Sequence, residues 1–270
     1  MPKIITEDMI EQAAIKALHE RHDYIVLNCM TEEPDTLPDG TGRKDKKQVV
    51  LPDVMFESLC RINPDIPEQT VRTVVDELCR TPVSGDLMLT NYHNYQKIRN
   101  GITVEYNMNG KKTSNILRLL SYNDALSNTF TVASQMWIKG ETHWRRPDLI
   151  IFINGFPMVF IELKNSNIPV KNAYDINLKN YLKDIPYLFN YNQICVLSNG
   201  METRLGSFAA GYEFFFEWLK VENEKENPDR KAIRENCTSL EYFIAGLCEP
   251  NNLLDYIENF ILYDRRRTKI

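Results

Sequence analysis

The chain is built around residues 145–165, which read RRPDLIIFINGFPMVFIELKN. Two parts of this segment, 149–153 and 156–161, are apolar runs rich in β-branched and aromatic residues. Asn154-Gly155 stands between the runs, and an Asn-Gly pair in this position is typical of a tight hairpin turn. The segment therefore predicts two antiparallel strands joined by a short turn.

Charged side chains occur only at the two ends of this hairpin. Closing the hairpin brings Asp148 towards Glu162 and Lys164, so two carboxylates and an ammonium group meet at one edge of the sheet. Carboxylate oxygens are ligands that magnesium prefers, and the arrangement predicts a magnesium site beside a positive charge. An ordinary buried hairpin with solvated ends is the alternative that the pattern leaves open.

The register of the hairpin decides whether this site can form. Side chains alternate between the faces of a strand, so Glu162 and Lys164 share a face. A regular two-residue turn would pair Asp148 with Ile161 and place Asp148 on the face opposite Glu162. An odd-length loop or a β-bulge restores the shared face. The magnesium site therefore requires one of the two between Phe152 and Pro157.

The residues around the hairpin extend this pattern into one that resembles a known family. Pro147-Asp148, thirteen residues and then Glu162-Leu163-Lys164 is similar to the PD-(D/E)xK nuclease signature. The wider text resembles the N-terminal nuclease domain of the restriction (R) subunit of type I restriction-modification enzymes. The residues that carry this resemblance are Asn128-Thr129-Phe130, Gln135, Arg146-Pro147-Asp148, Asn154-Gly155-Phe156-Pro157, Glu162-Leu163-Lys164-Asn165, Ile185-Pro186, Leu188-Phe189-Asn190-Tyr191-Asn192 and Ser198-Asn199-Gly200. The bare signature is weakly specific, whereas the combined run from about 106 to 206 is highly specific.

The resemblance implies an α/β fold in which helices flank a mixed central β-sheet, with extra helices at both ends of the chain. It also implies a Mg²⁺-dependent endonuclease that hydrolyses phosphodiester bonds of double-stranded DNA in the cytoplasm. The expected protein partners are methyltransferase (modification) and specificity subunits. ATP would serve only a DNA-translocating motor, and the motor's phosphate-binding pattern, Gly-x-x-x-x-Gly-Lys-[Ser/Thr], does not occur here.

The same resemblance implies roles for individual residues. Asp148 and Glu162 are expected to hold the metal. Lys164 is expected to orient or help deprotonate a water and to stabilise charge on the phosphate. Glu11 is a further candidate ligand, because related nucleases use a glutamate of the first helix. A solvated surface glutamate is the competing interpretation of Glu11.

Four more residues are accessory candidates. Arg145 and Arg146 are expected to hold the DNA backbone rather than to read bases. Asn177 and Tyr181 stand where many relatives carry Gln-x-x-x-Tyr, and residues four apart share one helix face. Asparagine is one methylene shorter than glutamine, so an ordinary exposed asparagine remains an equal interpretation of Asn177.

The composition fits a globular protein without membrane partners. Of the 270 residues, 43% are hydrophobic and 26% are charged, which supports a sizeable core. The formal net charge of −5 argues against a uniformly basic DNA-coating protein but leaves room for local basic patches. No apolar run is as long as a membrane span, and the N-terminus lacks a signal-peptide pattern. The six cysteines show no paired spacing and read as reduced.

Periodicity and turn signals outline the remaining elements. Helices are expected from a Thr6 cap to about 20, at 54–61, 68–80, 86–99 and 170–183, and as a pair within 239–263. Strands are expected at 24–30, at 103–108 and 116–120 where the sheet begins, at 130–138 and at 193–197. Residues 31–48 read as a mobile loop, and the aromatic run 208–218 as core. A nuclease domain is expected at 1–220, with its metal-site core at about 102–200. A charged helical extension at 221–270 would lead towards a motor that this sequence lacks.

Two other functions compete with this interpretation. The first is a catalytically silent DNA-anchoring or assembly module, against which the presence of all three signature residues counts. The second is a repair-type PD-(D/E)xK nuclease, which would not be followed by a translocating motor or work with methylation subunits.

Overall fold

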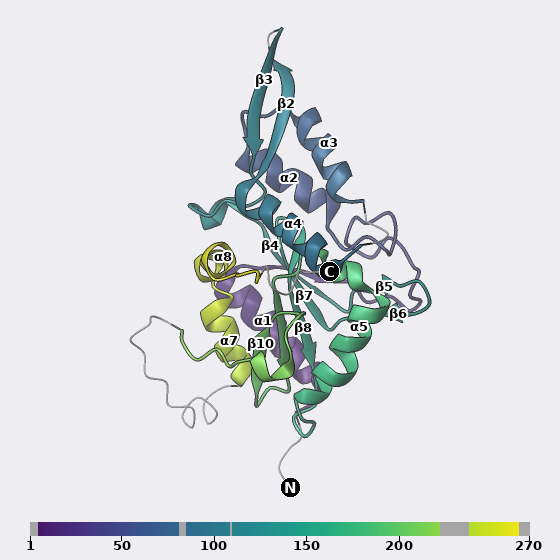
Figure 1. Cartoon of the computed structure of the whole chain (residues 1–270). Helices are drawn as coiled ribbons and strands as arrows, with labels where there is room; N and C mark the ends of the chain where they lie inside the picture. The colour runs from purple at the N-terminus through teal and green to yellow at the C-terminus, as the bar shows by residue number, and fades with distance from the viewer. Residues whose placement is uncertain (1–4, 81–84, 109, 222–237, 265–270) are drawn as a thin grey trace.

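The computed structural model of the protein describes residues 5–80, 85–108, 110–221 and 238–264. Its centre is a six-stranded sheet with the order β1-β4-β7-β8-β9-β10 (Figure 1). The strands are β1 (Ile25–Asn28), β4 (Phe130–Ser134), β7 (Leu149–Ile153), β8 (Phe156–Leu163), β9 (Ile194–Ser198) and β10 (Thr203–Gly206). β1 runs parallel to β4 and β8 parallel to β9, while the other neighbours are antiparallel. The expected mixed sheet flanked by helices is confirmed.

The two strands of the central hairpin are buried at every position. Their side chains alternate between two hydrophobic layers: Ile151 and Ile161 belong to one, Phe152 and Phe160 to the other. A strand covered on both faces needs no polar alternation, which explains why both runs are continuously apolar.

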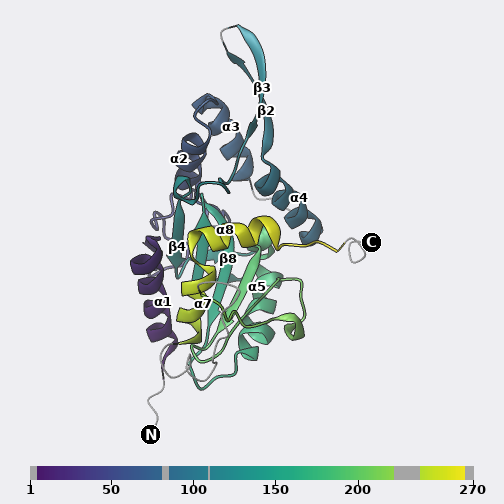
Figure 2. The same ribbon diagram turned by 90° about the vertical axis from the view of Figure 1, so that its left-hand side faces the viewer.

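One layer is covered by helices from both ends of the chain (Figure 2). The N-terminal helix α1 (Glu7–His22) is capped by Thr6, as expected. Beside it lie α7 (Ser239–Leu247) and α8 (Pro250–Asn259), the expected C-terminal pair. The Tyr24 hydroxyl donates to the carbonyl of Cys248 across this contact, at 2.9 Å. The charged segment before α7 lies from residue 222 to 237 outside the described residues.

The opposite layer is covered by the connection between β8 and β9. A π-helical stretch, η2 (Ala173–Leu178), continues directly into α5 (Lys179–Asp184). Because β8 and β9 are parallel, this is the expected strand–helix–strand unit. Short 3₁₀ turns lie at η1 (Ala125–Ser127), η3 (Pro186–Asn190) and η4 (Tyr212–Phe214).

The helices α2 (Pro52–Ile62), α3 (Glu68–Leu78) and α4 (Leu87–Asn100) lie at one end of the sheet, beside a hairpin that points away from the body (Figures 1 and 2). This hairpin, β2 (Ile102–Met108) and β3 (Lys111–Leu117), forms a two-stranded sheet of its own. The expectation that the main sheet begins here was wrong. Both strands are largely exposed, so they have too little apolar surface to join a central sheet.

Two further segments, the strand expected at 130–138 and the aromatic run at 208–218, depart from expectation. The strand expected at 130–138 ends at Ser134, and its last residues form a small separate sheet of β5 (Ile138–Lys139) with β6 (Trp144–Arg145). The aromatic run is only partly core, because Phe215 is buried whereas Phe214 and Phe216 are exposed. None of the described helices is long and apolar enough to cross a membrane.

The segment 31–48, expected to be a mobile loop, is instead anchored by buried charges. Asp39 is fully buried and accepts from Arg43 at 2.6 Å and from Lys46 at 2.7 Å. Arg43 also donates to the carbonyl of Trp137 at 3.1 Å. The polar residues that suggested a solvated loop therefore pair with one another beneath the surface.

Candidate active site

The register of the central hairpin combines a regular turn with a bulge. Asn154 and Gly155 both have positive φ, 49° and 82°, as a two-residue type I′ turn requires. Ile153 pairs with Phe156, so the turn alone would place the two signature carboxylates on opposite faces.

The ladder then shifts by one residue, because Phe152 pairs with Pro157 but Ile151 pairs with Val159. Met158 is the extra residue, one position beyond the predicted window. Proline lacks the N–H that a regular ladder uses and is tolerated at bulges. Below the bulge Leu149 pairs with Ile161, so the next step sets Asp148 opposite Glu162. The shared face required by the magnesium hypothesis is present.

The two carboxylates lie at the buried edge of this hairpin. Asp148 accepts from the backbone N–H of Leu163 at 2.7 Å, which ties the start of β7 to the end of β8. Glu162 is only 2% exposed, and among the described residues its Oε2 has no hydrogen-bond partner of ordinary geometry. Burial and, to a smaller extent, the charge of Asp148 raise the pKa of Glu162 to about 8, against the lowering effects of Lys164 and Tyr181. A buried carboxylate oxygen without a donor is a ready ligand for a cation.

Lys164 supplies the positive charge next to them. Its Nζ donates to Glu162 Oε1 at 3.1 Å and to the carbonyl of Leu163 at 2.6 Å. Its backbone N–H donates to the carbonyl of Ser198 at 2.8 Å, which extends the pairing of β8 with β9 beyond Leu163. The ammonium group is thus held by two contacts close to the carboxylates rather than projecting into solvent.

Glu11 reaches the same place from helix α1. It is buried, and its Oε2 accepts from the side-chain amide of Gln135. Burial, with a smaller contribution from the charge of Asp148, raises the pKa of Glu11 to about 7 against the lowering effect of that hydrogen bond. The structure therefore does not support the solvated helix glutamate that was the competing interpretation.

The N-terminus of α1 is attached to the chain just after Lys164. The backbone N–H of Glu7 donates to the Asn165 side chain at 2.9 Å, and the backbone N–H of Asn165 donates to Glu7 at 3.3 Å. Ile5 and Ser166 are joined by a second reciprocal pair of hydrogen bonds. These contacts fix the helix that carries Glu11 against the strand end that carries Glu162.

Gln135 is a site residue to which the sequence had assigned no role. It follows β4 with φ of 54°, a left-handed conformation that a non-glycine residue adopts at a cost and that is common at functional sites. Its backbone N–H donates to the carbonyl of Asp148 at 3.0 Å, while its side chain contacts Glu11. The sequence did contain one signal for Gln135, because it is among the residues that carry the family resemblance.

The donor set fits magnesium bound by a few protein oxygens. Among the described residues, no three His, Cys, Asp or Glu side chains converge closely enough to hold one ion by themselves. Asp148 and Glu162 nevertheless offer hard oxygens on one face, including the unpartnered Oε2. Magnesium commonly takes one or two carboxylates and keeps several waters, so this pair meets its requirements.

The two arginines before Asp148 differ in their contacts. Arg145 Nε donates to Asp184 at 2.7 Å, so this guanidinium is engaged in a partly buried ion pair. The Arg146 guanidinium lies 4.8 Å from the centre of the Trp137 ring. Its charge also acts to lower the pKa of Glu11, although burial outweighs it. Of the two, Arg146 is the one whose charge acts on a carboxylate of the candidate site.

Asn177 and Tyr181 come from η2 and α5. Both line a cavity of about 320 Å³ that Arg146 also lines. The Tyr181 hydroxyl donates to the carbonyl of Arg146 at 3.2 Å. Burial raises the pKa of Tyr181 well above its usual value, and the charges of Glu162 and Asp148 add to this. The structure thus brings Tyr181 to the carboxylates and places Asn177 in the cavity that Tyr181 also lines. A π-helical stretch such as the one that carries Asn177 is frequent at functional sites.

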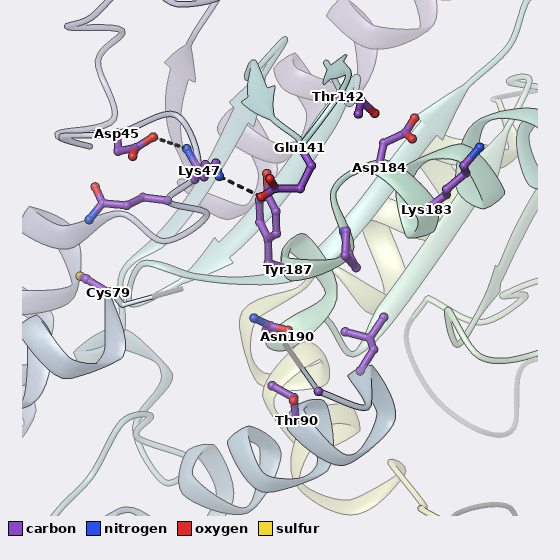
Figure 3. Close-up of a pocket in the computed structure, with 14 residues that line it drawn as sticks. Asp45, Lys47, Cys79, Thr90, Glu141, Thr142, Lys183, Asp184, Tyr187 and Asn190 are labelled. Atoms are coloured by element: carbon purple, nitrogen blue, oxygen red, sulfur yellow. Dashed lines mark hydrogen bonds and ion pairs between the residues drawn. The ribbon is translucent and has the colours of Figure 1, made fainter. Parts of the chain in front are cut away.

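A second cavity, of about 470 Å³, has Asp184, the partner of Arg145, in its lining (Figure 3). Its lining includes Asp184, Lys183, Tyr187 and the ion pair of Lys47 with Glu141, which Figure 3 shows facing one another. None of the signature residues lines it, so the cavity is separate from the candidate site.

Comparisons with known proteins agree with this picture. The family described as "Type I restriction enzyme R protein N terminus" matches residues 4–214. The HindI endonuclease subunit of Haemophilus influenzae is 34% identical over 230 residues, which are 83% of this chain and 21% of that protein. The putative MjaIXP endonuclease subunit of Methanocaldococcus jannaschii is 28% identical over 271 residues, which are 91% of this chain and 26% of that protein. This chain therefore spans about a fifth to a quarter of these curated relatives. It belongs to the family of type I restriction enzyme R protein N-terminal regions.

Proposed function

We propose that this domain is the Mg²⁺-dependent endonuclease part of a type I restriction enzyme R subunit and hydrolyses phosphodiester bonds of double-stranded DNA. The observation that supports this most directly is the buried group at the hairpin edge. A bulge brings Asp148 and Glu162 to one face beside Lys164, and Glu162 retains a buried oxygen without a donor. A purely structural hairpin has no need of such a costly arrangement.

The chain's own residues would divide the work as follows. Asp148 and Glu162 hold a magnesium ion, which when bound lowers the pKa of a water and neutralises charge on a phosphate. Lys164, close to Glu162, orients the attacking water and donates to the phosphate oxygens as their charge grows. Glu11 and Gln135 keep Asp148 in position and take a further part in the ligand shell through water. Arg146 and Tyr181 line the approach and hold the DNA backbone.

The relatives are named endonuclease subunits, which implies an assembly of several subunits. We propose that methyltransferase and specificity subunits are the partners, and that the specificity subunit reads the DNA sequence. ATP-driven translocation would be carried out by another part of the much longer R polypeptide. The domain would then cut DNA that the motor delivers to it.

The test compares metal binding with cleavage in the complete enzyme. Asp148→Asn should weaken Mg²⁺ binding measured by titration calorimetry and also abolish nicking of a plasmid. Asp175→Asn is the matched control, because that carboxylate is exposed and pairs only with lysines on its own helix. Metal binding by the wild type without any nicking would favour the silent anchoring module instead.

A further inference from the structure

The cavity beside the carboxylates has the size of a single nucleotide pocket. Its volume of about 320 Å³ lies at the small end of the range for ligand pockets. It is lined by Trp137, Trp144, Arg145, Arg146, Ile176, Asn177, Asn180 and Tyr181. Such a space admits one base with its sugar, whereas a DNA duplex is far too wide.

The walls combine aromatic faces with positive charge. Two half-buried indoles, Trp137 and Trp144, contribute to the lining, together with the exposed side chain of Ile176. Each indole has a cation over its ring: Arg146 lies 4.8 Å from the centre of Trp137, and Lys139 lies 5.6 Å from the centre of Trp144. Aromatic platforms beside cations are the combination that holds unpaired bases on a phosphate backbone.

The pocket also has polar groups for the edge of a base. The side-chain amides of Asn177 and Asn180 line the cavity and can both donate and accept. They can therefore pair with the polar edge of a base that enters it.

The pocket adjoins the candidate active site. Tyr181 lines it and donates to the carbonyl of Arg146, two positions before Asp148. Tyr181 is itself buried within the influence of Glu162 and Asp148. A nucleotide in the pocket would therefore lie next to a phosphate that meets the metal ion proposed for those two carboxylates.

Buried ion pairs keep the walls of the pocket in place. Arg43, paired with Asp39, donates to the carbonyl of Trp137 at 3.1 Å. Next to Trp144, the side chain of Arg145 pairs with Asp184. These contacts fix the backbone that carries the two indoles, so less conformational freedom is lost when a base stacks on them.

We propose that this pocket takes one unstacked base of the DNA strand, next to the phosphate that is cleaved. The inference rests on the proposed nuclease function, and it assigns to the domain a preference for DNA that is locally unpaired. A free nucleotide has the same chemistry, but continuity with the carboxylates favours a base that belongs to the bound strand. Trp144 and Trp137 stack on the base, while Arg146 faces its phosphate.

The test measures DNA binding by the complete R subunit without divalent metal, where cleavage plays no part. The probes are two duplexes of one sequence, one fully matched and one with a single mismatch that carries 2-aminopurine. The mismatched duplex should bind about 5- to 100-fold more tightly, the range expected when one base stacks on aromatic side chains. Binding should quench the 2-aminopurine fluorescence.

The variants separate stacking from folding. Trp144→Ala should abolish both the preference and the quenching, and Trp144→Phe should restore much of each. Phe214→Ala is the matched control, because that aromatic side chain is exposed elsewhere on the surface and should change neither. Equal affinity for the two duplexes, or a preference that survives Trp144→Ala, would overturn the proposal. Quenching of the fluorescence of the free 2-aminopurine nucleotide, without any preference between the duplexes, would also overturn it, in favour of a free-nucleotide site.

The outcome is independent of the chemistry at the carboxylates. Asp148→Asn should keep the preference for the mismatched duplex while losing nicking. Loss of the preference with normal Mg²⁺-dependent nicking would refute the base pocket alone. A retained preference without nicking by the wild type would refute the nuclease function alone.

Discussion

The pKa values of buried carboxylates are shifted in opposite directions in two regions of this protein. Asp39 faces two cations, Arg43 and Lys46. Burial by itself would raise the pKa of Asp39, but hydrogen bonds from Lys46 and Thr41 and the charge of Arg43 outweigh it and lower the pKa to about 2. At the hairpin edge, burial raises the pKa of Glu162 to about 8 and that of Glu11 to about 7.

The difference lies in the surroundings, since both groups contain ordinary acidic side chains. Desolvating a charge is costly everywhere, and a structural ion pair offsets the cost with opposite charge within the fold. At the hairpin edge, burial and neighbouring carboxylates instead favour the protonated forms of Glu162 and Glu11, and Lys164 does not outweigh this. A cation bound there would favour the charged forms, as Arg43 and Lys46 already do for Asp39. The first group holds a loop in place, and the role we propose for the second is to bind a cation.

The largest expected effect is on the balanced group. Asp39→Asn leaves Arg43 and Lys46 buried without their anion and should lower the free energy of unfolding by about 3–5 kcal/mol. Because the folded pKa of Asp39 is lowered, its contribution is complete above its unfolded value near 4 and is lost as pH falls through about 2. Urea unfolding at pH 7 and pH 3 should therefore give a smaller difference at pH 3.

The control for this change is Asp35→Asn, an exposed carboxylate in the same segment, which should be nearly neutral. A loss below about 1 kcal/mol at pH 7 for Asp39→Asn would mean that the buried ion pairs do not anchor the segment.

The next effect concerns the cation of the second group. Lys164→Ala should reduce cleavage about 100-fold or more, since an oriented charge at the reacting phosphate is worth roughly 3 kcal/mol. Mg²⁺ should bind as well as before or slightly better, because a nearby positive charge has been removed. Nicking rates and titration calorimetry on the complete enzyme measure the two quantities separately.

Lys171→Ala serves as the comparison, because that ammonium is exposed and pairs only with Asp175 on the helical segment after β8. Near-normal cleavage by Lys164→Ala would show that the assigned role of Lys164 is wrong.

A smaller effect is expected at Glu162, where a substitution should stabilise the fold, whereas Asp39→Asn should destabilise it. In metal-free protein at pH 7, burial and the neighbouring Asp148 force the Glu162 carboxyl to hold a proton that it would lose in the unfolded chain. Glu162→Gln removes this cost, so the free energy of unfolding should rise by roughly 1–3 kcal/mol, the scale of an uncompensated buried polar group. Adding Mg²⁺ should stabilise the wild type but not the variant. Thermal unfolding with and without Mg²⁺ measures both. Destabilisation of the metal-free variant would instead show that Glu162, like Asp39, has a structural role.

The smallest effect is expected at Asn177. If its amide serves in place of the usual glutamine, Asn177→Ala should slow cleavage several-fold, since one neutral hydrogen bond is worth about 1 kcal/mol. Folding should be unchanged by circular dichroism. Asn172→Ala, one helical turn earlier and outside the cavity lining, should cleave normally. Cleavage at the wild-type rate by Asn177→Ala would return Asn177 to the ordinary surface.

Some of the site could be predicted because its parts are neighbours in sequence. Glu162 and Lys164 share a strand, and the Asn-Gly turn defines the hairpin, so residue types and spacing suffice for both. The need for an irregular register also followed from the pattern alone. Its form did not, because a bulge at Met158 depends on how Pro157 is accommodated in a sheet that is buried on both faces.

The sequence by itself determined the features that depend on local chemistry: the hairpin, the Thr6 cap, the helical crossover between parallel strands and the family. Tertiary structure alone decided which polar residues are buried and with what partners. Glu11 meets Gln135 across 124 positions, and Arg43 meets the Trp137 carbonyl across 94. The physical reason is that desolvation and charge pairing act between whichever segments pack together. The same residue type therefore has a lowered pKa at Asp39, among cations, and a raised pKa at Glu162, beside another carboxylate.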